Sequence, residues 1–312
     1  MPDALDELVA ALGAEDPPRV WSLLITVFGD AVAPRGGAVS SATLGLVTGR
    51  LGIGSGAVRT ALSRLARDGW LERERRGRRS HYSLSASGRA PFAAASRRIY
   101  APADAAPDAR PRLLAIGARG TGGTHPPGEP DDGTAIELRA GLWLLVERDA
   151  AQRARLAGAG YLVASAVPGP MPGWLAERLG LAALDARCRR LRERFGALAA
   201  RPPTEPLDAL AARLLLVHAW RRLLLRAPVL PPALAPDGWA LPATRAFVAA
   251  LYRALLPASE RWLDDWGEGP DGPLPPADGA VRRRFSDGVG EVSEGDPEVE
   301  IGYRNRHTVD IR

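Results

Sequence analysis

The sequence predicts an α+β protein built from three parts, and three observations support this prediction. The N-terminal part is typical of three short helices followed by a charged hairpin, the middle contains short apolar segments separated by glycine and proline, and the last part contains long helical segments. The 312 residues also exceed the length of one ordinary small core. We therefore divide the chain into an acidic leader (1–16), an N-terminal domain (17–100), a linker with a small α/β domain (101–173), a helical domain (174–266) and a disordered tail (267–312).

The composition excludes several classes of chemistry. The chain contains no lysine, so all 41 positive side chains are arginines, which removes Schiff-base and phosphate-loop lysine chemistry. Cys188 is the only cysteine, and the four histidines are scattered, so neither a disulfide framework nor a metal site is expected. No signal peptide or membrane-spanning segment is evident, and no cofactor is expected; the prediction is a cytoplasmic protein that is not an enzyme.

The positive charge is concentrated in the N-terminal domain. Residues 17–100 contain fourteen arginines and four acidic residues, whereas the net charge of the whole chain is only +5. A basic domain in an otherwise acidic chain favours a polyanionic partner. The alternative is a solvated arginine surface with no partner.

The first two helices are predicted from their ends. The segment "PPRVWSLLITVFGDAVAPRGG" opens with prolines, carries apolar residues at helical spacing and ends at the glycine pair, which predicts the first helix. In "SSATLGLVTGRLG", Ser40 or Ser41 is a plausible N-cap and Gly52 ends the second helix. The "GIGS" that follows lacks the spacing of a dinucleotide-binding loop and is interpreted as a tight connection.

The third helix, in "GAVRTALSRLARDGW", has two different faces. Its apolar residues Val58, Ala61, Leu62 and Leu65 fall on one side. The opposite side carries arginines and small hydroxyl residues, which suit the major groove because arginine can donate to guanine and hydroxyls can donate to phosphate. The predicted contacts on this helix are Arg59, Thr60, Ser63, Arg64 and Arg67.

A basic hairpin is predicted directly after the third helix. Residues 70–84, "WLERERRGRRSHYSL", alternate in polarity on both sides of Gly77, which indicates two strands joined by a tight turn. Three helices followed by such a hairpin are typical of a winged helix-turn-helix, in which the third helix enters the major groove and the wing contacts the flanking backbone. The expected contacts on the wing are Arg75, Arg76, Arg78, Arg79 and Tyr82.

The remaining segments are assigned by composition and periodicity. "RLLAI", "AIELRAGLWLLVE" and "GYLVASAV" are predicted to be strands, with a helix in "RDAAQRARLAGA" before the last of them. Residues 172–198, 206–228 and 242–266 are predicted to be helical. Beyond residue 267 the abundance of Gly, Pro and acidic residues favours disorder.

No catalytic constellation is evident. A metal-dependent nuclease would need converging carboxylates, and the one candidate, Asp149, is better explained as the start of a helix. The tryptophans and arginines of the helical domain could instead form a pocket for an aromatic or acyl anion, although core tryptophans and solvated arginines explain them equally well. The residues considered for such an effector pocket are His218, Trp220, Arg221, Arg222 and Arg226.

Two stretches of the chain resemble the PaaX family, the transcriptional regulators of phenylacetic acid catabolism. They include "SLLITVFGDAVAPRGG", "AVRTALSRLARDGWLERERRGRRSHYSLSASGR" and "RRIY" in residues 17–100, and "LGLAALDARCRRLRERFGAL", "HAWRRLLLRAPVLPPAL" and "FVAALYRALLPASERWL" in residues 174–266. The resemblance implies a homodimeric repressor that binds a palindromic operator in double-stranded DNA. It also implies release of the DNA by an aryl-CoA thioester, typically phenylacetyl-CoA.

The central region departs from the family pattern. The resemblance implies a ferredoxin-like, Cas2-like central domain, but here a Gly/Pro-rich loop replaces part of it and only "GLWLL" matches a family strand. A shortened central domain leaves two alternatives open: a DNA-binding regulator with a degenerate sensor or a different effector, and, less favoured, a Cas2-like metal-dependent nuclease.

Overall fold

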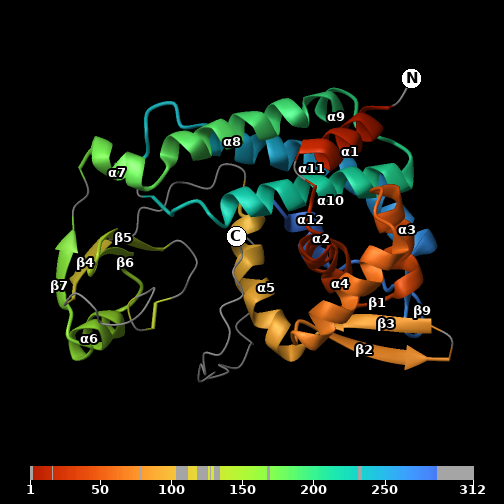
Figure 1. Cartoon of the computed structure of the whole chain (residues 1–312), viewed down its shortest axis with the longest axis horizontal. Coiled ribbons are helices and arrows are strands. Elements are labelled where there is room, and N and C mark those ends of the chain that lie inside the picture. Colours follow the sequence, from red (N-terminus) through yellow and green to blue (C-terminus); the bar gives the residue numbers. More distant parts are fainter. Residues whose placement is uncertain are drawn as a thin grey trace.

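The computed structural model is a mixed α and β protein. It describes residues 3–15, 17–77, 79–102, 112–117, 126, 128–129, 134–166, 169–230 and 234–286. Within these residues the strands form three antiparallel sheets of three, four and two strands. Figure 1 shows the four-stranded sheet at one end of the molecule and the β2–β3 hairpin near the other, with long helices extending between the two ends.

The N-terminal domain contains the predicted three helices and hairpin. Its elements are α2 (Val20–Val27), the π-helical turn η1 (Phe28–Val32), the 3-10 turn η2 (Ala33–Arg35), β1 (Ala38–Ser40), α3 (Ser41–Arg50), α4 (Ser55–Arg67), β2 (Leu71–Arg76), β3 (Arg79–Leu84) and α5 (Ala86–Ile99). Strand β1 adds to the hairpin, so the sheet has the order β1-β3-β2. The N-cap prediction for α3 is confirmed, because the Ser40 side chain accepts a hydrogen bond from the Thr43 amide at 3.1 Å.

The leader is helical rather than separate from the fold. Helix α1 (Ala4–Glu15) buries Leu5 and Leu8 against the helices of the C-terminal part. Asp6 and Glu7 of α1 are exposed, and Asp6 accepts a hydrogen bond from Arg50 of α3 at 2.9 Å. The leader thus joins the two larger parts of the molecule.

The central unit differs from the prediction in its number of strands. Residues 135–147 were expected to form one strand, but they form β5 (Ala135–Arg139) and β6 (Leu142–Val146). The chain reverses at residues 140–141, where Gly141 has a φ of 78°, a conformation that glycine adopts without strain. With β4 (Arg112–Ile116) and β7 (Leu162–Ala166), the sheet order is β5-β6-β4-β7, and helix α6 (Ala150–Gly158) precedes β7.

The C-terminal part consists of helices around a buried central one. They are α7 (Gly173–Arg178), α8 (Leu181–Arg194), α9 (Gly196–Ala200), α10 (Pro206–Leu224) and α11 (Ala240–Trp266). The helix expected over 172–198 is interrupted twice, the first time at Gly180, whose φ is 61°. Thirteen of the 19 residues of α10 are buried, which places this helix in the interior.

The predicted disorder beyond residue 267 is wrong for residues 267–286. These residues form β8 (Glu268–Gly269), β9 (Gly272–Pro273) and α12 (Gly279–Arg283). The segment has few large apolar residues, but three of them are buried at 5% exposure or less: Leu274, Val281 and Phe285. Residues 287–312 of the expected tail lie outside the described residues.

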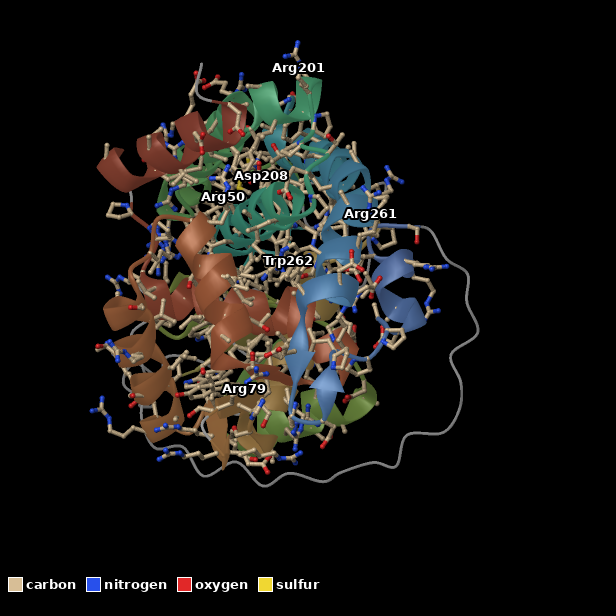
Figure 2. All side chains as sticks on the ribbon, turned by 90° about the vertical axis from the view of Figure 1, so that its right-hand side faces the viewer. Arg50, Arg79, Arg201, Asp208, Arg261 and Trp262 are labelled. Atoms are coloured by element: carbon tan, nitrogen blue, oxygen red, sulfur yellow. The ribbon has the colours of Figure 1, made fainter. Side chains whose placement is uncertain are left out.

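The N-terminal domain shares its core with the C-terminal helices. Leu210 and Leu214 of α10 and Trp262 of α11 belong to the same apolar cluster as Leu24 and Phe28 of the N-terminal domain. Figure 2 shows Trp262 at the centre of the molecule, between the ribbons of the two parts. The boundary at residue 100 therefore separates segments of sequence, whereas the apolar core is continuous across it.

Candidate nucleic-acid interface

The outer face of α4 is basic and accessible. Its apolar residues Val58, Ala61, Leu62 and Leu65 are buried, as the sequence predicts. The five residues predicted to contact DNA on this helix are all exposed: Arg59, Thr60, Ser63, Arg64 and Arg67. Asp68 is the acidic neighbour, lying 3.4 Å from Arg64 and 3.5 Å from Arg67, and both arginine side chains remain more than half exposed. Contacts of this kind between exposed groups are weak and easily exchanged.

The β2–β3 hairpin presents a second basic surface. Its strands pair from Leu71 opposite Leu84 to Arg76 opposite Arg79, and Gly77 turns with a φ of 60°. Arg73 and Arg75 are exposed, and their guanidinium groups donate to Ser80 Oγ at 2.9 Å and to the Gly77 carbonyl at 3.2 Å. Arg78, also a predicted contact, lies outside the described residues.

Tyr82 is not placed as the sequence analysis expected. It lies opposite Arg73 on the paired strand, and its side chain is 6% exposed within the apolar core of the N-terminal domain. Neighbouring residues of a strand point to opposite faces of the sheet. On the central strand β3, however, both Tyr82 on one face and His81 on the other are buried. Tyr82 therefore supports the sheet and is not available for a contact with DNA.

Two hairpin arginines are paired with acidic residues from the far end of the chain. Arg79 contacts Glu268 at 2.7 Å, and Arg76 contacts both Glu74 at 2.7 Å and Asp271. In Figure 2, Arg79 lies beside the short blue strands at the foot of α11. A cleft of about 360 Å³ lies between the β2–β3 hairpin and residues 265–273. The sequence contains no local signal for this contact, because almost 190 residues separate its two sides.

A buried ionic network connects the N-terminal domain to the C-terminal helices. Asp30, in η1, is fully buried and pairs with Arg213 of α10 at 2.8 Å and with Arg284 at 2.9 Å. Glu260 of α11 pairs with Arg213 at 2.6 Å and with Arg35 at 2.7 Å. Burial raises the pKa of Glu260, but the charges of Arg213 and Arg35 outweigh it and hold that pKa below its ordinary value.

The two tyrosines beside Asp30 complete this network. Tyr100 donates to Asp30 Oδ1 at 2.7 Å and Tyr252 donates to the same oxygen at 3.1 Å. Burial and the charge of Asp30 raise the pKa of Tyr252 to about 12, so its hydroxyl stays protonated as a donor. The charges of the network are paired among its own members and lie away from solvent, which is the character of a structural connection and not of a reactive site.

Three of the five residues considered for an effector pocket make contacts inside the fold. Trp220 is fully buried and donates to the Ile99 carbonyl at 2.9 Å, and His218 lies with Nδ1 3.2 Å from Thr26 Oγ1. Arg221 donates to Ser22 Oγ at 2.8 Å, whereas Arg226 is exposed and Arg222 is half-buried. The cavity beside Arg221 measures about 30 Å³, close to the volume of one water molecule and too small for an aryl group.

The interpretation of Asp149 as a helix start is confirmed. Its carboxylate caps α6 by accepting a hydrogen bond from the Gln152 amide at 2.7 Å. Within the described part of the chain, no group of three or more His, Cys, Asp or Glu residues is arranged to hold a metal ion. In the same residues, no helix combines the length and the apolar character needed to cross a membrane.

Comparison with known proteins identifies the family. Residues 19–88 match the family described as PaaX-like protein, and residues 180–265 match the PaaX-like protein C-terminal domain. The chain is 30% identical over 297 residues to the transcriptional repressor PaaX of Escherichia coli K12, covering 86% of this chain and 90% of that protein. It also aligns with uncharacterized protein Rv0674 of Mycobacterium tuberculosis, at 20% identity and a TM-score of 0.44, covering 77% of this chain and 97% of the other.

These matches cover both the basic N-terminal domain and the helical C-terminal part. Together with the identity over most of the chain, they agree with the resemblance seen in the sequence. The family is one of transcriptional regulators and not of enzymes. The chain belongs to the PaaX family.

Proposed function

We propose that this chain is a transcriptional repressor that binds double-stranded DNA through a winged helix-turn-helix formed by residues 17–100. The observation that carries the proposal is the outer face of α4, where Arg59, Arg64 and Arg67 stand exposed above a buried apolar seam. The β2–β3 hairpin follows this helix directly, in the position of a wing. The E. coli relative, named as a transcriptional repressor, supports the same assignment.

The two basic surfaces are proposed to have different roles. Arginine at the major groove reads guanine bidentately, so Arg59 and Arg64 are assigned to sequence discrimination, with Thr60 and Ser63 beside them. The wing arginines Arg75, Arg76, Arg78 and Arg79 are assigned to phosphate contacts, which add affinity for any duplex. A homodimer of this kind would bind a palindromic operator whose half-sites lie about one helical turn apart. Its place of action would be the cytoplasm.

The first prediction separates these roles by substitution. The variant R59A/R64A is expected to lose discrimination between operator and non-operator duplex, by about 1–3 kcal/mol for each bidentate contact. The variant R76A/R78A/R79A is expected to weaken binding to both duplexes. It should also reduce the dependence of log K on log salt by about one unit for each phosphate that the wing no longer binds. Gel-shift titrations over a salt series measure both effects.

The control removes a comparable charge from the other end of the molecule. Arg201 is exposed, and Figure 2 shows it at the opposite end from Arg79. R201A should therefore bind both duplexes as the wild type does. If R59A/R64A kept its discrimination, α4 would not be the recognition helix; an unchanged affinity and salt dependence in the wing variant would remove the wing assignment.

The effector proposal rests on family membership alone. We propose that an aryl-CoA thioester of the phenylacetate type releases the DNA and so relieves repression of aromatic catabolism genes. The sheet order β5-β6-β4-β7 supports a ferredoxin-like central domain, since a four-stranded β-α-β-β-α-β unit gives that neighbour pattern. Two measurements test the effector proposal: calorimetric titration of the protein with aryl-CoA thioesters, and release of bound duplex by the same compounds. Neither heat nor release would favour the degenerate sensor or a different effector.

A further inference from the structure

The β8–β9 hairpin is fixed to the N-terminal domain at its base. The amide of Glu268 donates to Thr43 Oγ1 at the start of α3, at 3.0 Å. Leu274, which follows β9, is 5% exposed and belongs to the apolar core of the N-terminal domain. A Cβ added at Gly267 would lie 2.6 Å from a methyl carbon of Leu274, so the chain packs closely where it leaves α11. The position of the hairpin is thus set by the fold and not by its charged contacts.

The hairpin carries its two carboxylates to the wing. Glu268 is bound by Arg79, and Asp271 at the turn is bound by Arg76. The side chains remain accessible, with Arg79 63% and Asp271 88% exposed. The cleft between the two hairpins is lined on one side by Arg76 and Arg79 and on the other by residues 265–273. These ion pairs therefore bridge a solvent-filled gap and can be exchanged without opening the core.

We propose that the β8–β9 hairpin is an internal competitor for DNA, whose carboxylates take the place of backbone phosphates on the wing. The inference rests on the proposed function, because it concerns the same wing arginines. Carboxylate and phosphate accept the same charge-assisted hydrogen bonds from a guanidinium group. An arginine that donates to Glu268 or Asp271 cannot direct those N–H groups to a phosphate, so part of the wing's affinity is withheld until the acids are displaced.

The location of the hairpin makes this competition adjustable from the C-terminal part. Helix α11 runs for 27 residues, about 40 Å at the usual rise, and continues directly into β8. Its first turns pack with α8, and its last turn packs in the core of the N-terminal domain. A movement of α11 that carried β8 away from Thr43 would therefore change the distance between the acidic pair and the wing.

The test neutralises the acids with isosteric amides. The variant E268Q/D271N is expected to bind operator and non-operator duplex roughly three- to tenfold more tightly at low salt, since two exposed ion pairs no longer oppose binding. The gain should shrink as salt screens the pairs. The matched control is D265N, because Asp265 lines the same cleft and makes no ion pair with a described residue. Gel-shift titration measures the duplex affinity of the wild type and of both variants.

A second comparison shows whether the gain passes through the wing. In an R76A/R79A background, E268Q/D271N should give no gain, because the competing pairs are already absent. The proposal is overturned if E268Q/D271N leaves affinity unchanged, if D265N gives the same gain, or if the gain persists without Arg76 and Arg79. The proposed function stands in each of these cases provided that R59A/R64A loses discrimination. A wild-type chain that binds no duplex at any salt concentration overturns both.

Discussion

Individual buried residues show how closely the two main parts of this molecule are connected. Asp30 in the N-terminal domain receives contacts from Arg213, Tyr252 and Arg284, all of which come from the C-terminal part. The sequence cannot predict such a partner set, because 183 residues separate Asp30 from Arg213 and no local pattern links the two. It does predict the exposed arginines of α4, because one helical period determines which side chains face the core.

His218, where α10 contacts the N-terminal domain, makes the stability of the protein depend on pH. Burial, together with the charges of Arg221 and Arg222, lowers the pKa of His218 to about 3. An unfolded histidine titrates near 6.5, so as pH falls the unfolded chain takes up this proton before the folded chain does. The contribution to stability is therefore complete above about pH 6.5 and declines between pH 6.5 and pH 3.

The expected effect is measurable by chemical denaturation. Between pH 8 and pH 5.5 this one group should lower the free energy of unfolding by about 1.4 kcal/mol. H218Q removes the titrating group and should flatten the dependence in this window, while H81Q, which leaves His218 in place, should keep it. An unchanged slope in H218Q would show that His218 is not buried as a neutral base.

At the scale of elements, a helix cap joins three segments. Ser40 Oγ accepts from the Thr43 amide and lies 3.1 Å from Thr43 Oγ1, which in turn accepts from the Glu268 amide of the β8–β9 hairpin. We predict that S40A lowers the free energy of unfolding by about 1 kcal/mol, the usual cost of removing an N-cap. S41A is the matched control, since Ser41 is exposed in the first turn. Urea titration compares them, and equal losses of stability in both would exclude a capping role.

Elements with clear ends were predictable from the sequence, and elements held by distant contacts were not. Apolar spacing and caps predicted α3, α4 and both strands of the β2–β3 hairpin. The β5–β6 reversal was missed because apolar residues continue on both sides of Gly141. Residues 267–286 were missed for a different reason: their composition favours disorder, yet a few buried side chains and the Arg284 contact with Asp30 are enough to fix them. Composition averages over a segment, whereas order here depends on single residues.

At the scale of the whole molecule, the proposed DNA-binding domain depends on the rest of the chain. Leu210, Leu214, Trp262, Leu263 and Leu274 complete its apolar core, and in return its Leu23, Leu51 and Ile99 lie in the core of the C-terminal helices. The family resemblance divides the sequence into a DNA-binding part and a helical part. The packing joins the two parts. A movement of α10 or α11 would therefore displace side chains that pack against the helices of the N-terminal domain.

The final prediction follows from this shared core. A fragment of residues 17–100 would expose apolar surface that α10, α11 and Leu274 normally cover, and its Asp30 would be left without Arg213 and Arg284. Exposed apolar surface costs about 25 cal/mol per Å², and the net stability of a domain is small, so the loss of this cover weighs heavily against independent folding. We expect the fragment to show no cooperative thermal transition by circular dichroism. A chain of residues 3–286 should unfold in one transition that includes both parts. Two separate transitions in that chain, or cooperative unfolding of the fragment, would show that the N-terminal domain is stable on its own.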